Sequence, residues 1–266
     1  MKDTVKGISK ILSADKKKPL FLFLDFDGTI APLRKRPGDA FLPRGTHRIL
    51  KKLASGKNVT LVIITGRSLK DIAGRVGIKK AVYAGNHGLE IKGQGVHLSV
   101  KGLEKAKTAV KELSRVLKRK LAKIKGVIVE DKYVTISVHY RMTPDRKVPA
   151  VMESVLSEVS YYEKKNILRS SGGKKIIEIK PDVKWDKGKA ALYIVKRLKA
   201  VRAGSPLVVY MGDDRTDEDA FRALGDKGIT IHVGTGRTDA RYSVKGTGEV
   251  RALLGALAGV WGKNEG

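Results

Sequence analysis

Short apolar runs alternate with amphipathic helical segments at both ends of this chain, and no other sequence feature constrains the fold as strongly. Strands that alternate with helices in this way pair in parallel and carry helices on both faces of the sheet. We therefore expect an α/β fold with a doubly wound parallel sheet. The expected strands span residues 19–26, 58–67, 79–88, 205–214 and 228–234, and the expected helices span residues 43–55, 68–78, 184–200, 216–225 and 246–259.

The helix expected at residues 68–78 has a recognisable beginning. Ser68 is of the residue type that caps helix N-termini, and Asp71 stands three residues later, at the capping-box position. Both residues indicate where this helix starts.

The middle of the chain differs in texture and predicts an inserted unit. A long amphipathic helix at residues 102–124 precedes two strands at 126–141, which turn at Asp131 and Lys132. A second helix at 145–160 precedes two strands at 166–181, which turn at a Ser-Gly-Gly segment. Such a unit can form its own sheet with both helices on one face. We expect core residues 1–90, a cap at 91–183 and core residues 184–266, with hinges near 88–93 and 181–184.

The first apolar run, Leu20–Leu24, is followed by two aspartates, Asp25 and Asp27, around the apolar Phe26. Open α/β sheets bind ligands at the C-terminal ends of their parallel strands. Residues two apart on a strand point the same way, so both carboxylates are expected to reach one site. One exposed aspartate at a strand end is ordinary, whereas this pair indicates function.

A second apolar run ends in a denser acidic group, Asp213 and Asp214, followed by Asp217, Glu218 and Asp219. Acidic residues in the first turn of a helix are ordinary partners of its dipole. That explanation does not cover Asp213 and Asp214, which would repel the first aspartate pair across a shared crevice. A cation between them would remove the repulsion, and oxygen-only ligands favour Mg²⁺.

Composition narrows the function classes. The sequence has no cysteine, which excludes disulfides and thiolate chemistry. No apolar run approaches the ~20 residues of a membrane span, and the N-terminal residues lack the apolar segment of a secretory signal, so we expect a cytoplasmic protein without membrane contact. The formal charge of +28 would attract polyanions. The lysines are spread over the chain without aromatic interleaving, however, so nucleic-acid binding is disfavoured.

Four stretches, "DFDGT", "ITGRS", "WDKGKA" and "GDDRTDEDAF", resemble in this order the motifs of the haloacid dehalogenase (HAD) superfamily of phosphotransferases. The resemblance implies a HAD-like core with an inserted α/β cap of the C2B type. It implies Asp25 as the nucleophile that forms an aspartyl-phosphate, and Asp27 as the acid–base that also offers its backbone carbonyl to Mg²⁺. The implied metal group is Asp25, Asp27, Asp213, Asp214 and Asp217.

Phosphate must be neutralised before a carboxylate can attack it, so cations and N–H donors are expected around it. Lys187 is the candidate cation, although on its own it would be interpreted as one surface lysine among many. Thr65 and the backbone amides of Gly28 and Gly66 can donate hydrogen bonds to phosphate oxygens. Arg67, in the same motif as Thr65, completes the phosphate side of the expected substrate site.

Three further stretches, "YAGNHGLE", "SVHYR" and "GKKIIEIKP", make the chain similar to the trehalose-6-phosphate phosphatase family. The resemblance implies hydrolysis of trehalose 6-phosphate in trehalose biosynthesis. It also implies substrate contacts from Asn86, His87, Glu90, His139, Arg141, Lys174 and Glu178. On residue type alone, His139, Arg141 and Glu178 would be ordinary half-exposed strand residues.

Two alternatives stay open at this point. The same chemistry fits other sugar phosphates, such as mannosyl-3-phosphoglycerate or sucrose 6-phosphate, and a basic nucleic-acid-binding protein could retain a phosphatase scaffold. Against the second, clustered carboxylates would oppose a polyanion in the crevice. The expected partner is a small sugar phosphate, and the sequence does not reveal whether a trehalose-phosphate synthase binds.

Overall fold

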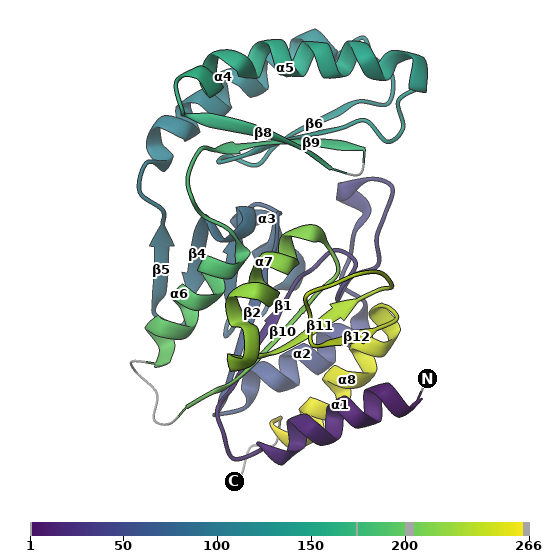
Figure 1. Cartoon of the computed structure of the whole chain (residues 1–266), viewed down its shortest axis with the longest axis vertical. Coiled ribbons are helices and arrows are strands. Elements are labelled where there is room, and N and C mark those ends of the chain that lie inside the picture. Colours follow the sequence, from purple (N-terminus) through teal and green to yellow (C-terminus); the bar gives the residue numbers. More distant parts are fainter. Residues whose placement is uncertain (1, 174, 200–204, 263–266) are drawn as a thin grey trace. The chain divides into compact units, whose positions relative to one another are not determined.

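The computed structural model describes residues 2–173, 175–199 and 205–262. The chain forms two compact units (Figure 1), one of Met1–Leu98 with Trp185–Gly266 and one of Ser99–Lys184. We call them the core unit and the cap unit and describe each by itself.

A sheet of eight strands, counted over the described residues, runs through the core unit in the order β12-β11-β10-β1-β2-β3-β4-β5. Its strands β1 to β3 and β10 to β12 are parallel, and β4 is antiparallel to β3. Because the chain moves from β1 towards β3 in one direction and from β10 towards β12 in the other, the C-terminal ends of β1 and β10 form the topological switch point. The bounds are β1 Leu20–Leu24, β2 Val59–Ile64, β3 Val82–Gly85, β4 Glu90–Gly93, β5 Val96–Ser99, β10 Leu207–Gly212, β11 Ile229–Val233 and β12 Tyr242–Val244.

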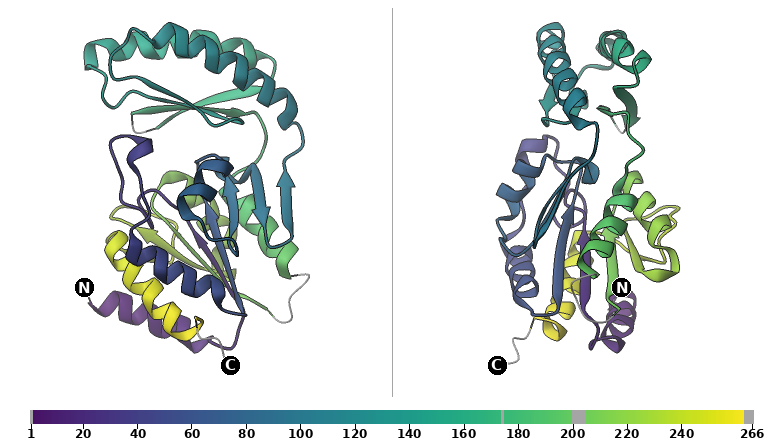
Figure 2. Two further views of the ribbon diagram at one scale, coloured as in Figure 1. Left: turned by 180° about the vertical axis from the view of Figure 1, so that it is seen from behind. Right: turned by 90° about the vertical axis from the view of Figure 1, so that its left-hand side faces the viewer.

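Helices cover both faces of this sheet (Figures 1 and 2), so the expected doubly wound α/β architecture is confirmed. Alternate residues of β1 belong to two hydrophobic clusters. Leu20, Leu22 and Leu24 pack with α1 (Lys2–Ala14), α2 (Arg44–Ser55), α3 (Leu69–Val76) and α8 (Thr247–Val260). Phe21 and Phe23 pack with α6 (Lys187–Lys199) and α7 (Arg215–Leu224). The strand is therefore buried on both sides, which explains its unbroken apolar sequence.

The cap unit contains the two helices and four strands that the sequence predicts. Helices α4 (Leu103–Leu121) and α5 (Val148–Lys164) share one hydrophobic cluster with the sheet β6-β7-β9-β8, whose neighbouring strands are antiparallel. The strands are β6 Ile128–Asp131, β7 Ile136–His139, β8 Leu168–Gly173 and β9 Ile176–Pro181.

Both predicted turns of the cap lie further along the chain than expected. The first is at Tyr133 and Val134, because the N–H of Lys132 donates to the carbonyl of Thr135 and the carboxylate of Asp131 accepts from the N–H of Tyr133. In the second, β8 continues through the Ser-Gly-Gly segment, and Gly173 pairs with Ile176.

The first boundary between the units also differs from the expected position at residue 91. Residues 90–93 form β4, which pairs with β3 inside the core sheet, and the cap unit begins at Ser99. The hinge expected at 88–93 is therefore part of the core. The second boundary lies between Lys184 and Trp185, one residue after the expected position.

Across residues 2–173, 175–199 and 205–262, no helix has both the length and the apolar character needed to cross a membrane.

Candidate active site

The two aspartates after β1 are held in different ways. The N–H of Asp25 donates to the carbonyl of Met211 at 2.9 Å, which continues the β1–β10 ladder, and its side chain is buried. Asp27 lies beyond the strand, in a turn where the N–H of Gly28 donates to Ala31. The strand alternation expected to aim both carboxylates therefore ends before Asp27, and the turn sets its direction instead.

Lys187, the first residue of α6, is 1% exposed. Its Nζ lies 2.9 Å from Oδ1 of Asp25 and 2.8 Å from Oδ1 of Asp217. Burial opposes the charge of Lys187, but the carboxylates of Asp214, Asp217 and Asp25 outweigh it and raise the pKa of this lysine well above its usual range. Lys187 is thus a buried ammonium beside Asp25, not one of the surface lysines.

Carboxylate oxygens of Asp25, Asp213 and Asp217 all lie within 4.8 Å of one another. Burial is the main cause that raises the pKa of Asp25 well above its usual range, and burial with neighbouring carboxylates raises the pKa of Asp213 to about 7 and that of Asp217 to about 6. Burial and mutual repulsion thus disfavour the ionised form of these carboxylates. A divalent cation that prefers oxygen ligands, such as Mg²⁺, would offset both effects.

Asp214 and Asp217, both in the predicted metal group, also support the local structure. Oδ1 of Asp217 accepts from Lys187 and from the hydroxyl of Tyr210, and Oδ2 accepts from the N–H groups of Asp213 and Asp214. Asp214 caps α7 through the N–H groups of Thr216 and Asp217. These contacts leave Asp25 and Asp213 as the better-placed carboxylates for a metal, with Asp217 holding the loop and Lys187.

Gly28 sits where no other residue fits. Its φ of +87° is in the left-handed region, and a Cβ there would lie 2.0 Å from Oδ2 of Asp213. Asp213 also accepts from the hydroxyl of Thr29 at 3.1 Å. The glycine therefore lets the turn after β1 approach the acidic loop after β10.

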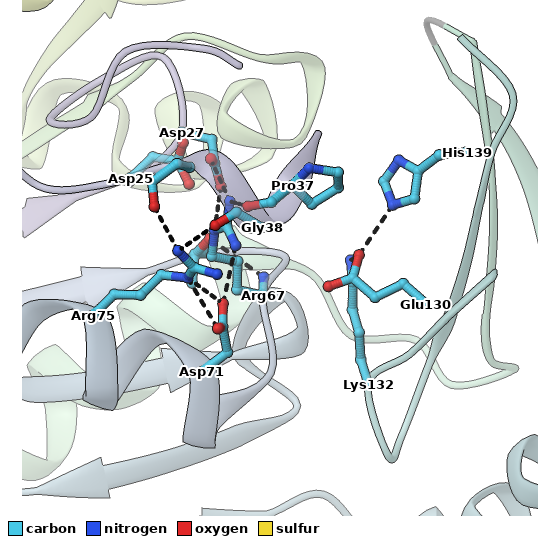
Figure 3. Close-up of polar contacts among 12 residues, drawn as sticks. Asp25, Asp27, Pro37, Gly38, Arg67, Asp71, Arg75, Glu130, Lys132 and His139 are labelled. Carbon is cyan, nitrogen blue, oxygen red and sulfur yellow. Dashed lines mark hydrogen bonds and ion pairs between the residues drawn. The ribbon is translucent and has the colours of Figure 1, made fainter. Parts of the chain in front are cut away.

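Thr65, Gly66 and Arg67 follow β2. Thr65 is 2% exposed, and its Oγ1 accepts from the N–H of Arg67. A Cβ on Gly66 would lie 2.7 Å from Cε1 of His87, which keeps this position small. The guanidinium of Arg67, predicted to contact substrate, instead donates to Asp27, Asp71 and the carbonyl of Pro37 (Figure 3).

Asn86 and His87 form the start of a 3-10 turn, η2 (Asn86–Gly88), and both have left-handed backbones, with φ of 51° and 58°. Each such non-glycine residue costs on the order of 1–3 kcal/mol, and such strain clusters at functional sites. The side chain of Asn86 donates to Glu90 at 3.1 Å. The core thus brings together the predicted substrate residues Asn86, His87 and Glu90.

The cap unit carries the other predicted substrate residues except Lys174, which lies outside the described residues. His139 is on β7 and Glu178 on β9, where Glu178 pairs with Ser137; Arg141 follows β7. Residues opposite one another on neighbouring strands share a face, so Glu178 and Glu130, which also pairs with Ser137, lie on one face of the cap sheet.

Sequence reasoning missed Glu130, whose carboxylate contacts His139, and Lys132, which lies near the same carboxylate (Figure 3). Oε2 of Glu130 lies 3.0 Å from Nε2 of His139 and 4.0 Å from Nζ of Lys132, which is 8% exposed. The available signal was the two-residue spacing of Glu130 and Lys132 in "IVEDK", which places them on one side of an extended segment.

The fold is that of HAD-like α/β hydrolases. A haloacid dehalogenase-like hydrolase from Bacteroides thetaiotaomicron matches the fold with a TM-score of 0.61 at 13% identity, over 89% of this chain and 98% of that one. The C-terminal domain of trehalose-6-phosphate phosphatase from C. albicans matches with a TM-score of 0.75 at 25% identity, over 94% and 96% of the two chains.

The chain belongs to the trehalose-phosphatase family, whose model matches residues 23–247. Trehalose-phosphate phosphatase B of Arabidopsis thaliana is 32% identical over 93% of this chain and 68% of its own length. The trehalose-phosphate phosphatase of Mycobacterium tuberculosis is 35% identical over 80% of this chain, which spans about half (53%) of that relative. The family expected from the motifs is thereby confirmed.

Gly28→Ala should nearly abolish phosphatase activity, because the added methyl group would displace Asp213. Gly77→Ala is the matched control: Gly77 also has a positive φ, of +63°, but its Cβ would meet nothing within 4 Å. Both variants should lose stability through backbone strain, by roughly 1 kcal/mol or more, and only Gly28→Ala should lose activity. Urea unfolding and phosphate release measure the two effects, and equal activities of the two variants would contradict this account.

The acidic cluster also predicts how stability depends on pH. Without metal, the folded protein holds more protons on Asp213 and Asp217 than the unfolded chain does between about pH 4 and about pH 7, because folding raises both pKa values. The free energy of unfolding should therefore fall as pH rises through this range. Asp71 and Asp214, whose pKa values are lowered, lose their contribution only below about pH 4 and do not oppose the trend.

Added Mg²⁺ should recover this stability at neutral pH and have less effect near pH 5, where the protonated carboxylates are poor ligands. Urea unfolding of chelator-treated protein at both pH values, with and without Mg²⁺, measures the difference. Asp213→Asn should reduce both the pH dependence and the response to Mg²⁺. A metal effect of the same size at both pH values would contradict the assignment.

Proposed function

We propose that this protein hydrolyses trehalose 6-phosphate to trehalose and inorganic phosphate through an aspartyl-phosphate on Asp25. The observation that carries the proposal is the buried contact of 2.9 Å between Asp25 and Lys187 beside Asp213 and Asp217. The names of the curated relatives, trehalose-phosphate phosphatases of plants and mycobacteria, support the choice of substrate.

In the first step, a carboxylate oxygen of Asp25 attacks phosphorus and the bond from phosphorus to the sugar oxygen breaks. Asp27 donates a proton to that oxygen, so trehalose leaves as a neutral alcohol. Lys187 offsets the negative charge of the phosphoryl group, and Thr65 with the N–H group of Gly66 donates to its oxygens. The N–H of Gly28, which the sequence predicted as a third donor, is already used by the carbonyl of Ala31.

In the second step, water attacks the phosphorus of the aspartyl-phosphate and Asp27, now ionised, accepts a proton from it. The phosphorus–Asp25 bond breaks, which releases phosphate and regenerates the carboxylate. One residue thus donates and then accepts the same proton equivalent, so no second acid–base is required.

The carboxylates of Asp25 and Asp213, with the backbone carbonyl of Asp27, would hold Mg²⁺. When bound, this ion neutralises phosphate charge that would otherwise repel the attacking carboxylate. Asp217 and Asp214 support the site by fixing Lys187 and the loop that carries Asp213.

Polar side chains suit the recognition of sugar hydroxyls. Asn86, His87 and Glu90 serve in the core. In the cap we assign His139, Arg141, Lys174 and Glu178, and we add Glu130 because it pairs with His139. Carboxylates and imidazoles accept from paired hydroxyls, whereas arginine and lysine suit phosphate. A synthase partner and a cytoplasmic location stay predictions.

Trehalose 6-phosphate should give the highest kcat/KM in a panel that includes sucrose 6-phosphate, mannosyl-3-phosphoglycerate and glucose 6-phosphate. A chelator should abolish turnover and Mg²⁺ should restore it, since the acidic cluster needs a cation. Phosphate release measures both. Preference for another member of the panel would replace the substrate while keeping the chemistry, and full activity in chelator would contradict the metal assignment.

Asp27→Asn should lower kcat for trehalose 6-phosphate by roughly 10²–10⁴-fold, the usual range for loss of a general acid–base. Its backbone carbonyl is unchanged, so stabilisation by Mg²⁺ should persist. Asp39→Asn, at an exposed aspartate, is the matched control and should keep native turnover. Near-native turnover by Asp27→Asn would show that another group handles the proton.

A further inference from the structure

Arg67 binds the carboxylate of Asp27, the proposed acid–base. Its Nε lies 2.6 Å from Oδ2 of Asp27 and its Nη2 2.7 Å from Oδ1, so the planar guanidinium binds both oxygens of one carboxylate (Figure 3). Nη2 also donates to the carbonyl of Pro37 at 2.9 Å. The Arg67 side chain is 7% exposed, against 33% for Asp27. The buried partner therefore fixes the more exposed one.

Asp71 occupies the other end of the same guanidinium. It accepts from Nη1 of Arg67 at 2.9 Å and from Nε of Arg75 at 2.8 Å. Its position in the sequence is that of a capping-box residue, but only half of the box forms: Ser68 accepts from the N–H of Asp71, while the Asp71 carboxylate faces the two arginines. Hydrogen bonds and charge from Arg75 and Arg67 outweigh burial and lower the pKa of Asp71, so it stays ionised.

Arg75 ties this arrangement to the loop that follows β1. Its Nη1 donates to the carbonyls of Gly38 and Ala40, on either side of the residue that ends η1 (Pro37–Asp39). Arg67 reaches the same loop through Pro37. Asp27, Arg67, Asp71 and Arg75, which we call the Arg67 network, thus alternate in charge from the acid–base to α3, with both arginines anchored on one loop.

We propose that Asp71 and Arg75 are positioning residues for the reaction: they fix the guanidinium of Arg67, which in turn holds the Asp27 carboxylate in its proton-transferring orientation. This inference rests on the proposed function, in which Asp27 is the general acid–base. Asp25 is aimed by the β1–β10 ladder, but Asp27 lies in the turn beyond it. A carboxylate on a turn needs an external constraint to stay in one rotamer, and a two-pronged arginine contact supplies it.

If Asp71 only stabilised helix α3, it would not affect proton transfer by Asp27. Substrates whose leaving groups differ in their need for a proton distinguish this structural role from the proposed positioning role. Trehalose 6-phosphate releases an alkoxide that needs a proton, whereas p-nitrophenyl phosphate releases a stable phenolate that does not. Misplacing Asp27 should therefore slow aspartyl-phosphate formation from the first substrate more than from the second, whereas its role as base in the second step affects both substrates alike. The two substrates are therefore compared by kcat/KM, which covers the steps up to release of the alcohol or phenolate. General damage to the site would slow both equally.

The decisive variant is Asp71→Asn, which keeps the size of the side chain and removes its charge. We expect kcat/KM for trehalose 6-phosphate to fall roughly 10–100-fold, as for a displaced catalytic group. The kcat/KM for p-nitrophenyl phosphate should change by less than about 2-fold, since aspartyl-phosphate formation from this substrate does not depend on the acid. Asp71→Glu should recover part of the loss, because it restores the charge. Arg75→Gln removes the next member and should show the same selectivity more weakly.

Ser68→Ala is the matched control, because it removes the cap of the same helix, a bond to the backbone N–H of Asp71, and leaves the four side chains of the Arg67 network in place. It should lower the melting temperature and leave the ratio of the two activities unchanged. Equal losses on both substrates in Asp71→Asn and Arg75→Gln would overturn the proposal. So would faster turnover of trehalose 6-phosphate, which would show that Arg67 restrains Asp27.

The experiment keeps this inference distinct from the proposed function. If the wild-type protein hydrolyses p-nitrophenyl phosphate and another sugar phosphate but not trehalose 6-phosphate, the substrate assignment fails. The ratio measured with that other sugar phosphate then tests the Arg67 network, because every sugar alkoxide needs a proton to leave.

Discussion

The contact of the buried Lys187 ammonium with Asp25 and Asp217 is the interaction on which the rest of the site depends. An ion removed from water costs several kcal/mol unless other groups compensate, and here Asp25 and Asp217 lie within 2.9 Å of it. Asp217 is itself held by Tyr210 and by the N–H groups of Asp213 and Asp214. Close packing is part of this arrangement, since a Cβ on Gly188 would lie 2.4 Å from the carbonyl of Asp219, and one on Gly212 2.1 Å from Cγ of Asp217. Helix α6, helix α7 and the end of strand β10 therefore approach so closely at Gly188 and Gly212 that no side chain fits at these two positions.

Much of the fold follows from local pattern alone. The apolar run at Leu20–Leu24 could only be a strand buried on both faces, and its position beside β10 brings Asp25 to the acidic loop. The four cap strands and two cap helices were equally predictable, because the spacing of their apolar residues is typical of each type of element. The helix at Lys2–Ala14 was not predicted, since charged residues obscure the spacing of Ile8 and Leu12, which are buried. Strands β4, β5 and β12 were missed because each has only three or four residues, too few for a clear periodicity in the sequence.

The site divides along the same line. Asp25, Lys187 and the acidic residues after β10 were predictable because each lies at the end of an element whose type the sequence shows. Roles that depend on contacts across the sheet were not predictable. Arg67 was assigned to the substrate, yet the structure directs it to Asp27. Asp71 was assigned to a helix end, yet its carboxylate lies between two arginines. In both cases the residue type indicated a charged contact, but the sequence did not indicate which residue is the partner.

The two charged groups around the aspartates differ in what they require. Asp25, Asp213, Asp214 and Asp217 lie around one ammonium, so negative charge remains for a divalent cation to balance. Burial first, and then the neighbouring carboxylates, raises the pKa values of Asp25, Asp213 and Asp217. The Arg67 network pairs its carboxylates with guanidinium groups and needs no further ion. In the proposed mechanism, the surroundings of Asp25 would become complete only with metal, whereas Asp27 is oriented by the protein alone. Such an arrangement pre-orients Asp27 before metal and substrate bind, so its rotational entropy is already lost when the reaction begins.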